Sequence, residues 1–365
     1  MQSTEILFSL FVFTLISLIF NYLILKWTKT LGAKNAANVG EIRWSDSYKP
    51  AIGGVSFFIV FLIAYLVYLF AYRPSLSLTE ETQHLGILIA ITIGFFTGLA
   101  DDAYNTVPWL KLVAQITTGF VLIYTGVVID FFGIELADAI LTIFWTVAVM
   151  NSINMLDNMD GVTASVSVFI LFSAALTAYP LTDNNLFYTF VCGGTAAAIV
   201  GFLYFNWNPS KMFMGDTGSQ MLGALLAAIG ILFFWNNENV IETGAWWQKI
   251  AIVAVAFAVP IGDSLTVTIN RIKRGQSPLV GGRDHTTHHL SFAGLSDRNV
   301  ALVMVGFSLI SSALIGLLSL SESLQQTGYY IVLICYAVAV IGFLYSTTVW
   351  KKSRQVYLEK HAPKK

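Results

Sequence analysis

The chain has 365 residues, of which 56% are hydrophobic and 11% are charged, with a formal net charge of -1 at pH 7. Soluble domains carry about 45–50% apolar and about 25% charged residues, so this composition, with a mean hydropathy of +0.70, excludes an ordinary soluble domain. Both cysteines, Cys192 and Cys335, lie in apolar segments, which argues against a disulfide framework or a thiolate metal site. The sequence predicts an all-α integral membrane protein.

Apolar runs of roughly 17–25 residues are long enough to cross about 30 Å of hydrocarbon as helices. Eleven runs meet this description, at approximately 5–26, 51–72, 85–100, 110–129, 139–156, 162–180, 186–206, 217–235, 248–270, 300–320 and 328–349. Membrane β-strands are about half this length and alternate with period two, so strands are not expected. The first run has no basic n-region and no small-residue cleavage site, and we expect a retained helix there.

The positions of the basic residues predict the orientation. With eleven crossings, 18 of the 20 Lys and Arg residues fall on one side, leaving Arg73 and Lys249 on the other. Basic loops face the cytoplasm, so we expect the N-terminus outside and the C-terminus inside. The predicted organisation is one membrane domain over residues 1–350 and a basic cytoplasmic tail over 351–365. The expected cytoplasmic active-site loops cover about 27–50, 101–111, 151–162, 206–217 and 271–299.

The conspicuous polar clusters all fall on the predicted cytoplasmic side. In chain order they are ADDAYNTVPWLKL (100–112), MNSINMLDNMDG (150–161), FNWNPSKMFMGDTGSQ (205–220) and IGDSLTVTINRIKRGQSPLVGGRDHTTHHL (261–290). Because they lie in four different loops of one face, we expect a single cavity to gather them.

Asp101 and Asp102 are adjacent carboxylates at the end of an apolar run. They repel each other near lipid unless a cation or a shared proton offsets their charge. Mg²⁺ suits this pair, because it takes one or two carboxylates and leaves positions for substrate phosphates. The alternative is an acidic loop in water at the interface.

In the second cluster, Asn151, Asn154 and Asn158 share one helix face, and Asp157 and Asp160 follow them. Amides can bind sugar hydroxyls or phosphate oxygens, and carboxylates can bind metal or accept protons. Capping of a polar helix end is the alternative, but five such residues within ten exceed what capping requires.

The two later clusters combine groups that suit an anion. Asp216 stands among glycines and hydroxyls before an apolar run, as an N-cap or beside a helix start whose N–H groups can bind phosphate. The last cluster places His285, His288 and His289 near Arg283 and other cations. Its spacing is not that of a zinc site, and cations with imidazoles suit a diphosphate better. Together the clusters indicate phosphoryl chemistry next to lipid.

These four ordered motifs, ADD…K (Asp101, Asp102, Lys111), NxxNxxDNxDG (Asn151–Gly161), FNxxPxxxFMGDTGS up to Ser219 and PxxD…RxxxGxSP…HH (Pro260–His289), resemble the polyprenyl-phosphate N-acetylhexosamine-1-phosphate transferases of glycosyltransferase family 4. The resemblance spans roughly residues 50 to 290 and extends to the eleven helices of the branch that uses UDP-GlcNAc. Family members usually show His-x-His-His or His-His-His, whereas Thr286 and Thr287 here separate His285 from the following pair. The pair His288 and His289 is therefore the better match.

The resemblance implies roles for matching residues. Asp216, with Asp101 and Asp102, would bind Mg²⁺, with Mn²⁺ as a second candidate. The predicted catalytic residues are Asp101, Asp102, Asp157, His288 and His289. The predicted substrate-binding residues are Lys111, Asn151, Asn154, Asp160, Asn206, Arg283 and His285.

The resemblance also implies the reaction. N-acetylglucosamine-1-phosphate would pass from UDP-GlcNAc to undecaprenyl phosphate, as the first membrane step of a cell-envelope polysaccharide, in a bacterial cytoplasmic (inner) membrane with the site facing the cytoplasm. We expect membrane lipids but no nucleic acid as partners, and dimerisation stays open. The alternatives are the phospho-MurNAc-pentapeptide transferase of peptidoglycan synthesis and, from another class, a cation-coupled transporter. A transporter usually places its charges near the bilayer midplane, unlike these one-sided clusters.

Overall fold

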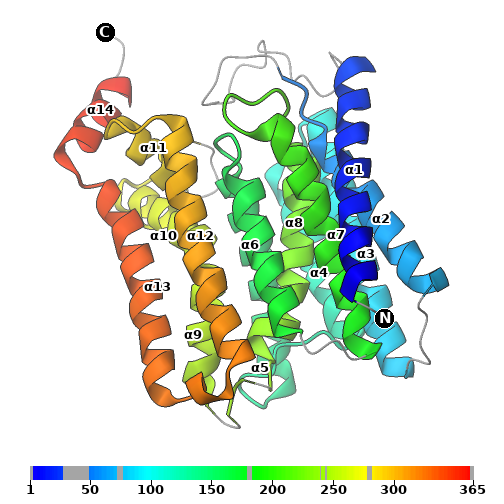
Figure 1. The fold of residues 1–365 in the computed structure, drawn as a ribbon. Helices are drawn as coiled ribbons and strands as arrows, with labels where there is room; N and C mark the ends of the chain where they lie inside the picture. Colours follow the sequence, from blue (N-terminus) through cyan, green and yellow to red (C-terminus); the bar gives the residue numbers. More distant parts are fainter. Residues whose placement is uncertain are drawn as a thin grey trace.

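The computed structural model describes residues 3–27, 49–71, 77–178, 183–238, 240–242, 245–277 and 282–361. Every regular element in these segments is a helix (Figure 1). In chain order they are α1 (Ser3–Trp27), α2 (Gly53–Ala71), α3 (Leu78–Tyr104), α4 (Pro108–Tyr124), α5 (Glu135–Leu156), α6 (Val162–Thr177), α7 (Asp183–Asn206), α8 (Gly215–Gly230), the π-helical η1 (Ile231–Trp235), α9 (Trp246–Ala256), α10 (Ala258–Lys273), α11 (Thr286–Phe292), α12 (Asp297–Leu320), the 3₁₀ turn η2 (Glu322–Leu324), α13 (Thr327–Thr347) and α14 (Lys351–His361).

Each of the eleven predicted apolar runs forms a helix or a pair of consecutive helices. Within the described segments, eight helices are long and apolar enough to cross a membrane, and α9 with α10 makes a ninth span if the pair is counted as one. The remaining two, α4 and α6, have 17 and 16 residues, about 24–26 Å at the helical rise per residue. The all-α membrane fold is confirmed, while the number of crossings and the end that faces the cytoplasm stay predictions.

The predicted run over 248–270 is helical but is not one continuous helix. The chain bends by 86° between α9 and α10. Pro260 accounts for the break, because it has no N–H to donate to the carbonyl of Ala256 and its ring would clash with that carbonyl. The bend turns α10 almost perpendicular to α9, beneath the short α11 at the upper end of the bundle in Figure 1.

The helix α8 forms the centre of the bundle. The helices α2, α3, α5 and α6 pack around it, and every residue from Thr217 to Gly230 is buried. Small residues allow this close packing: a Cβ at Gly98 of α3 would lie only 2.1 Å from the carbonyl oxygen of Asp216. The first turn of α8 is therefore enclosed by its neighbours, and side chains from several helices reach it.

The outer surface of the bundle is strongly apolar. Exposed large side chains occur on most of the long helices, among them Phe8, Phe70, Phe96, Phe120 and Phe144. An apolar surface of this extent needs a partner other than water, as the lipid of a membrane provides. In Figure 1 the first residues of α1 lie toward the lower end, while α11 and α14 lie at the upper end. The chain is a multi-pass membrane protein.

Candidate active site

The first turn of α8 is capped by a side chain from α3. Gly215 begins α8 with φ of +72°, which favours glycine, and a Cβ there would meet Asp102 Oδ2 at 2.5 Å. The carboxylate of Asp102 accepts hydrogen bonds from Asp216 N (3.1 Å), Thr217 N (2.8 Å) and Thr217 Oγ1 (2.8 Å). Asp216 is therefore not the N-cap, and these two amides already have an acceptor. The predicted metal and catalytic roles of Asp102 stay predictions.

Lys111, in the first turn of α4, lies between two carboxylates. Its Nζ is 2.6 Å from Asp101 Oδ2 and 2.9 Å from Asp216 Oδ2. The other oxygen of Asp101, a residue only 2% exposed, accepts from Thr106 N (2.9 Å) and Thr106 Oγ1 (2.7 Å). One ammonium thus serves two carboxylates, and the cluster keeps an excess of negative charge that favours a further cation.

Asn154 of α5 completes the contacts of Asp216. Its Nδ2 donates to Asp216 Oδ1 (3.0 Å) and to Ser219 Oγ (2.8 Å). Both oxygens of Asp216 are therefore held, one by an amide and one by Lys111. The structure brings together four of the predicted site residues, Asp101, Lys111, Asn154 and Asp216, from four different helices.

A layer of amide side chains lies one helical turn deeper. Asn151 Nδ2 donates to Gln115 Oε1 (2.8 Å), and Gln115 Nε2 donates to Gln220 Oε1 (3.2 Å). Gln115 and Gln220 each follow a site residue, Lys111 or Asp216, by four positions, and Asn151 precedes Asn154 by three. We did not predict Gln115 or Gln220, although this shared spacing was available in the sequence. Asn151, predicted to bind substrate, joins this layer.

Asp157 follows α5 directly and is half-buried. Its carboxylate makes no hydrogen bond with any part of the chain that the structure describes. Burial raises the pKa of Asp157 well above its ordinary value, and the negative charges of Asp216, Asp102 and Asp160 raise it further. A half-buried carboxylate with a raised pKa beside a charged cluster is typical of a proton acceptor in an active site.

Asp160 and Asn206, both predicted to bind substrate, make contacts that organise the loop between α7 and α8. Asp160 accepts from Ser210 N (2.9 Å), Ser210 Oγ (2.7 Å) and Asn208 Nδ2 (3.2 Å). Asn206 is buried, accepts from Gly161 N (3.0 Å) and donates to Met212 O (2.9 Å). These contacts fix the approach to α8, and substrate binding by the two residues stays a prediction.

The histidine segment is oriented by Asp263 of α10, which was part of a quoted motif but not among our predicted site residues. The fully buried Asp263 lies 2.8 Å from His285 Nδ1 and accepts from Thr286 N (2.8 Å) and Thr286 Oγ1 (2.7 Å). The extra residue before the histidine pair thus lets His285 and Thr286 share one carboxylate. His285 is engaged with the protein, consistent with the lower weight that we gave it.

His288 and His289 lie on α11 and are both buried. Burial, aided by the charge of His285, lowers the pKa of His288 to about 3, and burial lowers that of His289 to about 4. Both rings are therefore neutral at pH 7, and each carries one N–H group. They can donate hydrogen bonds to a phosphate but do not supply positive charge to it.

Asn158 connects the histidine segment to the turn after α5. Its Oδ1 accepts from Thr287 Oγ1 (2.5 Å), and its Nδ2 donates to Met155 O (2.9 Å). Asp157 directly precedes Asn158 in the chain, so this bond ties α11 to the edge of the carboxylate cluster. Residues far apart in the sequence thus form one polar region at one end of the bundle.

The basic residues of the last loop are partly engaged. Arg271 binds Asp284 through Nε (3.0 Å) and Nη2 (2.7 Å), and Arg274 Nη2 lies 2.5 Å from the same carboxylate. Burial alone would raise the pKa of Asp284, but the hydrogen bonds and charge of Arg271 outweigh burial and hold that pKa below its ordinary value. The half-buried Arg283 has an Nε without a hydrogen-bond acceptor in the described residues, which leaves it suited to an anionic ligand.

Most of the predicted loop over 27–50 lies outside the described residues. Lys49, at its end, is described, and its Nζ donates to Ser210 Oγ (2.9 Å) and lies 3.8 Å from Asp160 Oδ2. Lys49 therefore lies in the polar region beside the α7–α8 connection.

The carboxylates are compatible with Mg²⁺. Among the described residues, no three His, Cys, Asp or Glu side chains form a complete metal cage. Mg²⁺ rarely needs one, because it usually takes one or two carboxylates and completes its shell with water and substrate phosphates. Asp101 and Asp216 meet this requirement, since their oxygens already converge on one cation, the ammonium of Lys111.

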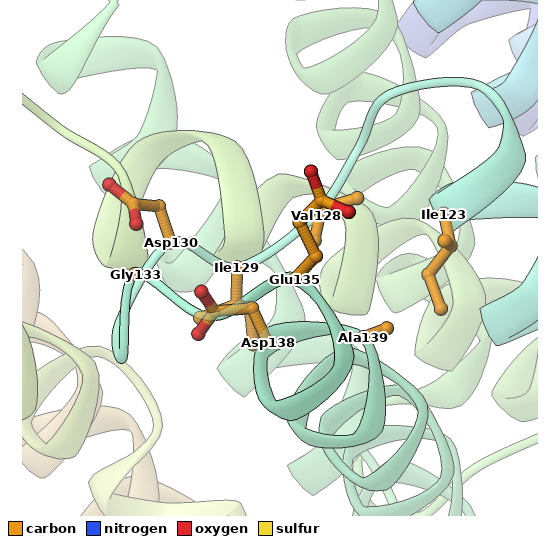
Figure 2. Close-up of a pocket in the computed structure, with 8 residues that line it drawn as sticks. All are labelled: Ile123, Val128, Ile129, Asp130, Gly133, Glu135, Asp138 and Ala139. Atoms are coloured by element: carbon orange, nitrogen blue, oxygen red, sulfur yellow. The ribbon is translucent and has the colours of Figure 1, made fainter.

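The opposite end of α4 and α5 contains a hollow of about 520 Å³ (Figure 2). It is lined by Ile123, Val128, Ile129, Asp130, Gly133, Glu135, Asp138 and Ala139. Lys111 begins α4 and Asn154 lies near the end of α5, so this hollow and the carboxylate cluster are a helix length apart. The hollow contains none of the predicted site residues.

Comparisons with known proteins identify relatives over most of the chain. Residues 84–234 match glycosyl transferase family 4. The probable undecaprenyl-phosphate N-acetylglucosaminyl 1-phosphate transferase of Bacillus subtilis is 28% identical over 281 residues, 74% of this chain and 74% of that protein. The decaprenyl-phosphate N-acetylglucosaminephosphotransferase of Mycolicibacterium smegmatis is 26% identical over 312 residues, 78% of this chain and 76% of that protein.

A third relative is named for a different activity. The phospho-N-acetylmuramoyl-pentapeptide-transferase of Staphylococcus saprophyticus is 30% identical over 295 residues, covering 73% of this chain and 84% of that protein. The range 84–234 contains Asp101, Lys111, Asn154, Asp157 and Asp216, so the family match includes the carboxylate cluster and the helices that build it.

Proposed function

The chain belongs to glycosyl transferase family 4, and from this premise we propose that it transfers N-acetylglucosamine-1-phosphate from UDP-GlcNAc to undecaprenyl phosphate. The products are undecaprenyl-diphospho-GlcNAc and UMP. The observation that carries the proposal is the convergence of Asp101, Lys111 and Asp216 at the end of three helices within the family match. There, a charged phosphate can meet a lipid carrier whose chain lies along the apolar surface of the bundle.

The reaction is a phosphoryl-group substitution. A phosphate oxygen of the carrier attacks the β-phosphorus of UDP-GlcNAc, and the bond from that phosphorus to the oxygen bridging the two phosphates breaks. UMP leaves with the bridging oxygen, and the sugar phosphate stays on the carrier. Such reactions depend mainly on positioning and on stabilising charge, which the polar region can supply.

In this proposal, Asp101 and Asp216 hold Mg²⁺ next to Lys111. When bound, the metal neutralises charge on the diphosphate. Lys111 places its ammonium where negative charge grows on the phosphate oxygens, and Asn154 keeps Asp216 in its orientation. These positions are set before substrate binds, so the site needs little rearrangement during the reaction.

Asp157 is the proposed proton acceptor for the carrier phosphate. Its raised pKa and its freedom from hydrogen bonds within the described chain fit that task. On the other side of the polar region, neutral His288 and His289 donate hydrogen bonds to the sugar nucleotide, and Arg283 contributes positive charge.

The test is UMP release by purified protein in detergent with undecaprenyl phosphate and Mg²⁺. UDP-GlcNAc, UDP-GalNAc and UDP-MurNAc-pentapeptide are compared in parallel, since a relative with 30% identity carries the last activity. Release with UDP-GlcNAc alone supports the proposal. Release with UDP-MurNAc-pentapeptide alone replaces it with the muramoyl activity, and no release from any donor by folded protein refutes the transferase assignment.

The proposed setting is a bacterial inner membrane, with the polar end in the cytoplasm. The distribution of basic residues along the chain supports this orientation, because the sequence assigns only Arg73 and Lys249 to the opposite side. Of these, Lys249 lies in the first turn of α9, 3.8 Å from Asp130 at the opposite end of the bundle. A cysteine introduced at Lys273 should be shielded from an impermeant thiol reagent in intact cells, and one introduced at Glu135 should react. The reverse pattern would invert the topology.

A further inference from the structure

The C-terminal helix α14 packs on α11, the helix that carries His288 and His289. We had expected only a basic tail after residue 350. In the structure, α14 (Lys351–His361) follows α13 and lies beside α11 at the upper end of the molecule (Figure 1). Its principal partner among the described helices is α11, so its contacts bear on the histidine segment rather than on the membrane-spanning core.

Ser353 of α14 reaches the ring of His289. Ser353 is completely buried although its neighbour Arg354 is exposed. Its Oγ lies 2.7 Å from His289 Nδ1. A hydrogen bond to one ring nitrogen sets the orientation of the imidazole, and the serine hydroxyl can make this bond with either tautomer because it can donate or accept. Ser353 thus determines the direction in which the opposite edge of the His289 ring, which carries Nε2, points.

Tyr357 lies one turn after Ser353 on the same face of α14 and covers the imidazole. Its ring centroid is 5.4 Å from that of His289 and 6.4 Å from that of Phe292. The guanidinium of Arg274 also contacts Tyr357, with its central carbon over the tyrosine ring and 5.4 Å from the ring centre. Because Arg274 also binds Asp284, the tyrosine links the histidine pair to the Arg271–Asp284 group.

We infer that α14 is a positioning element for the active site, with Ser353 and Tyr357 as the residues that orient His289. Two different contacts, one to a ring nitrogen and one to the ring face, converge on this single imidazole. Packing of a tail helix requires neither a hydroxyl at Nδ1 nor an aromatic ring beside it. The orientation of His289 by α14 does not depend on the proposed function. Only the identity of the substrate that His289 contacts rests on it.

The first experiment does not depend on activity. Diethyl pyrocarbonate acylates accessible neutral imidazoles, and peptide mass spectrometry measures the rate at His289, which is 3% exposed in the intact protein. Tyr357→Ala and Ser353→Ala should each raise this rate about five- to tenfold, the effect of losing one contact of about 1 kcal/mol. Tyr357→Phe keeps the ring and should match wild type, as should Arg354→Ala on the exposed side. Unchanged labelling in both test variants would overturn the inference.

The second experiment separates positioning from general stability. In the UMP assay, Tyr357→Ala and Ser353→Ala should raise KM for UDP-GlcNAc about five- to tenfold and leave KM for undecaprenyl phosphate unchanged. Tyr357→Phe should restore the wild-type value. A lower kcat with both KM values unchanged would instead mean a merely structural helix. If wild type releases no UMP, the proposed function fails, and the labelling rates still decide whether α14 orients His289.

Discussion

Acidic side chains lie near both ends of the α4–α5 pair, and the two ends use them differently. At one end, Asp101 and Asp216 converge on the ammonium of Lys111. At the other end, beside the hollow of Figure 2, Asp138 accepts from Phe131 N (3.1 Å) and Phe132 N (2.8 Å) and so stabilises its own turn. A hollow with carboxylates is therefore not enough to identify a site. Convergence of carboxylates on a shared cation is the more specific signal.

The largest expected effect comes from Asp216→Asn. The amide keeps the shape of the side chain but loses the charge that faces Lys111, so kcat for UMP release should fall about 10³-fold. The protein should remain folded, because Asp101 still pairs with Lys111. The matched control at the other end is Asp130→Asn, a 74% exposed side chain that should leave kcat within about twofold of wild type. If Asp216→Asn kept a near-normal kcat, the carboxylate cluster would be no more important for turnover than the opposite end of the bundle.

The second prediction concerns Asp157→Asn, which removes the proposed proton acceptor. Turnover should fall about 10²-fold or more, the usual contribution of a positioned base. In wild type, kcat should decline as the pH falls through the raised pKa of Asp157, because the protonated form cannot accept a proton. The decline should be absent from the residual activity of the variant. A pH profile with the same acid limb in both proteins would assign the base elsewhere.

The Asp157→Asn variant also tests whether the folded state raises the pKa of Asp157. Because the folded state raises the pKa of Asp157, it binds this proton more tightly than the unfolded state does. The resulting stability is present at low pH and is lost as the pH rises through the folded pKa. Asp157→Asn cannot ionise, so its Tm in EDTA should exceed that of wild type at pH 8, and the difference should shrink toward pH 4. If Asp157→Asn had a lower Tm than wild type at pH 8, the predicted cost of ionising Asp157 in the folded protein would be contradicted.

A third, smaller effect is expected from the amide layer. Gln115→Leu removes the acceptor for Asn151 and the donor to Gln220, so α4 loses its polar contacts one turn below Lys111. We expect about a tenfold loss of kcat through misplacement of Lys111. Thr117→Val changes an exposed residue of the same helix and should retain full activity. Equal kcat in the two variants would mean that the layer does not align the site.

The smallest effect on turnover is predicted for Asp138→Ala in the hollow of Figure 2. Two backbone N–H groups lose their acceptor, which should lower the free energy of unfolding by about 1–3 kcal/mol. Turnover per folded molecule should stay within about twofold of wild type. Glu135→Ala, at an exposed position of the same helical turn, should change neither quantity. A large loss of turnover in Asp138→Ala would give the opposite end a part in the reaction.

Hydropathy predicted the helices well because lipid imposes long apolar runs, and each of the eleven became helical. Hydropathy failed where a local interaction decides whether the chain continues, breaks or forms a short helix. Pro260 breaks the run over 248–270, and a polar stretch too short for hydropathy analysis forms α11. The helix α14 was missed for the same reason, since its stability comes from contacts with α11 and not from apolar composition.

Within the site, the sequence indicated which residues gather but not how they pair. The motifs placed Asp101, Lys111, Asn154 and Asp216 at one end, and the structure confirms that they meet. Spacing along one helix cannot show a contact between helices, so the linkage of Gln115 with Gln220 was not predicted. The engagement of both oxygens of Asp102 by α8 was missed for the same reason.

The capping of α8 by Asp102 also determines what kind of anion the site accepts. The positive end of this helix dipole is already neutralised by a carboxylate of the protein itself. With Asp101, Asp216 and Asp157 nearby and Lys111 as their shared cation, an approaching free nucleotide diphosphate meets net repulsion. A diphosphate that arrives already complexed with a divalent ion is attracted by the same charges. If UDP-GlcNAc binds here as proposed, the cap would therefore favour its metal-loaded form over the bare nucleotide.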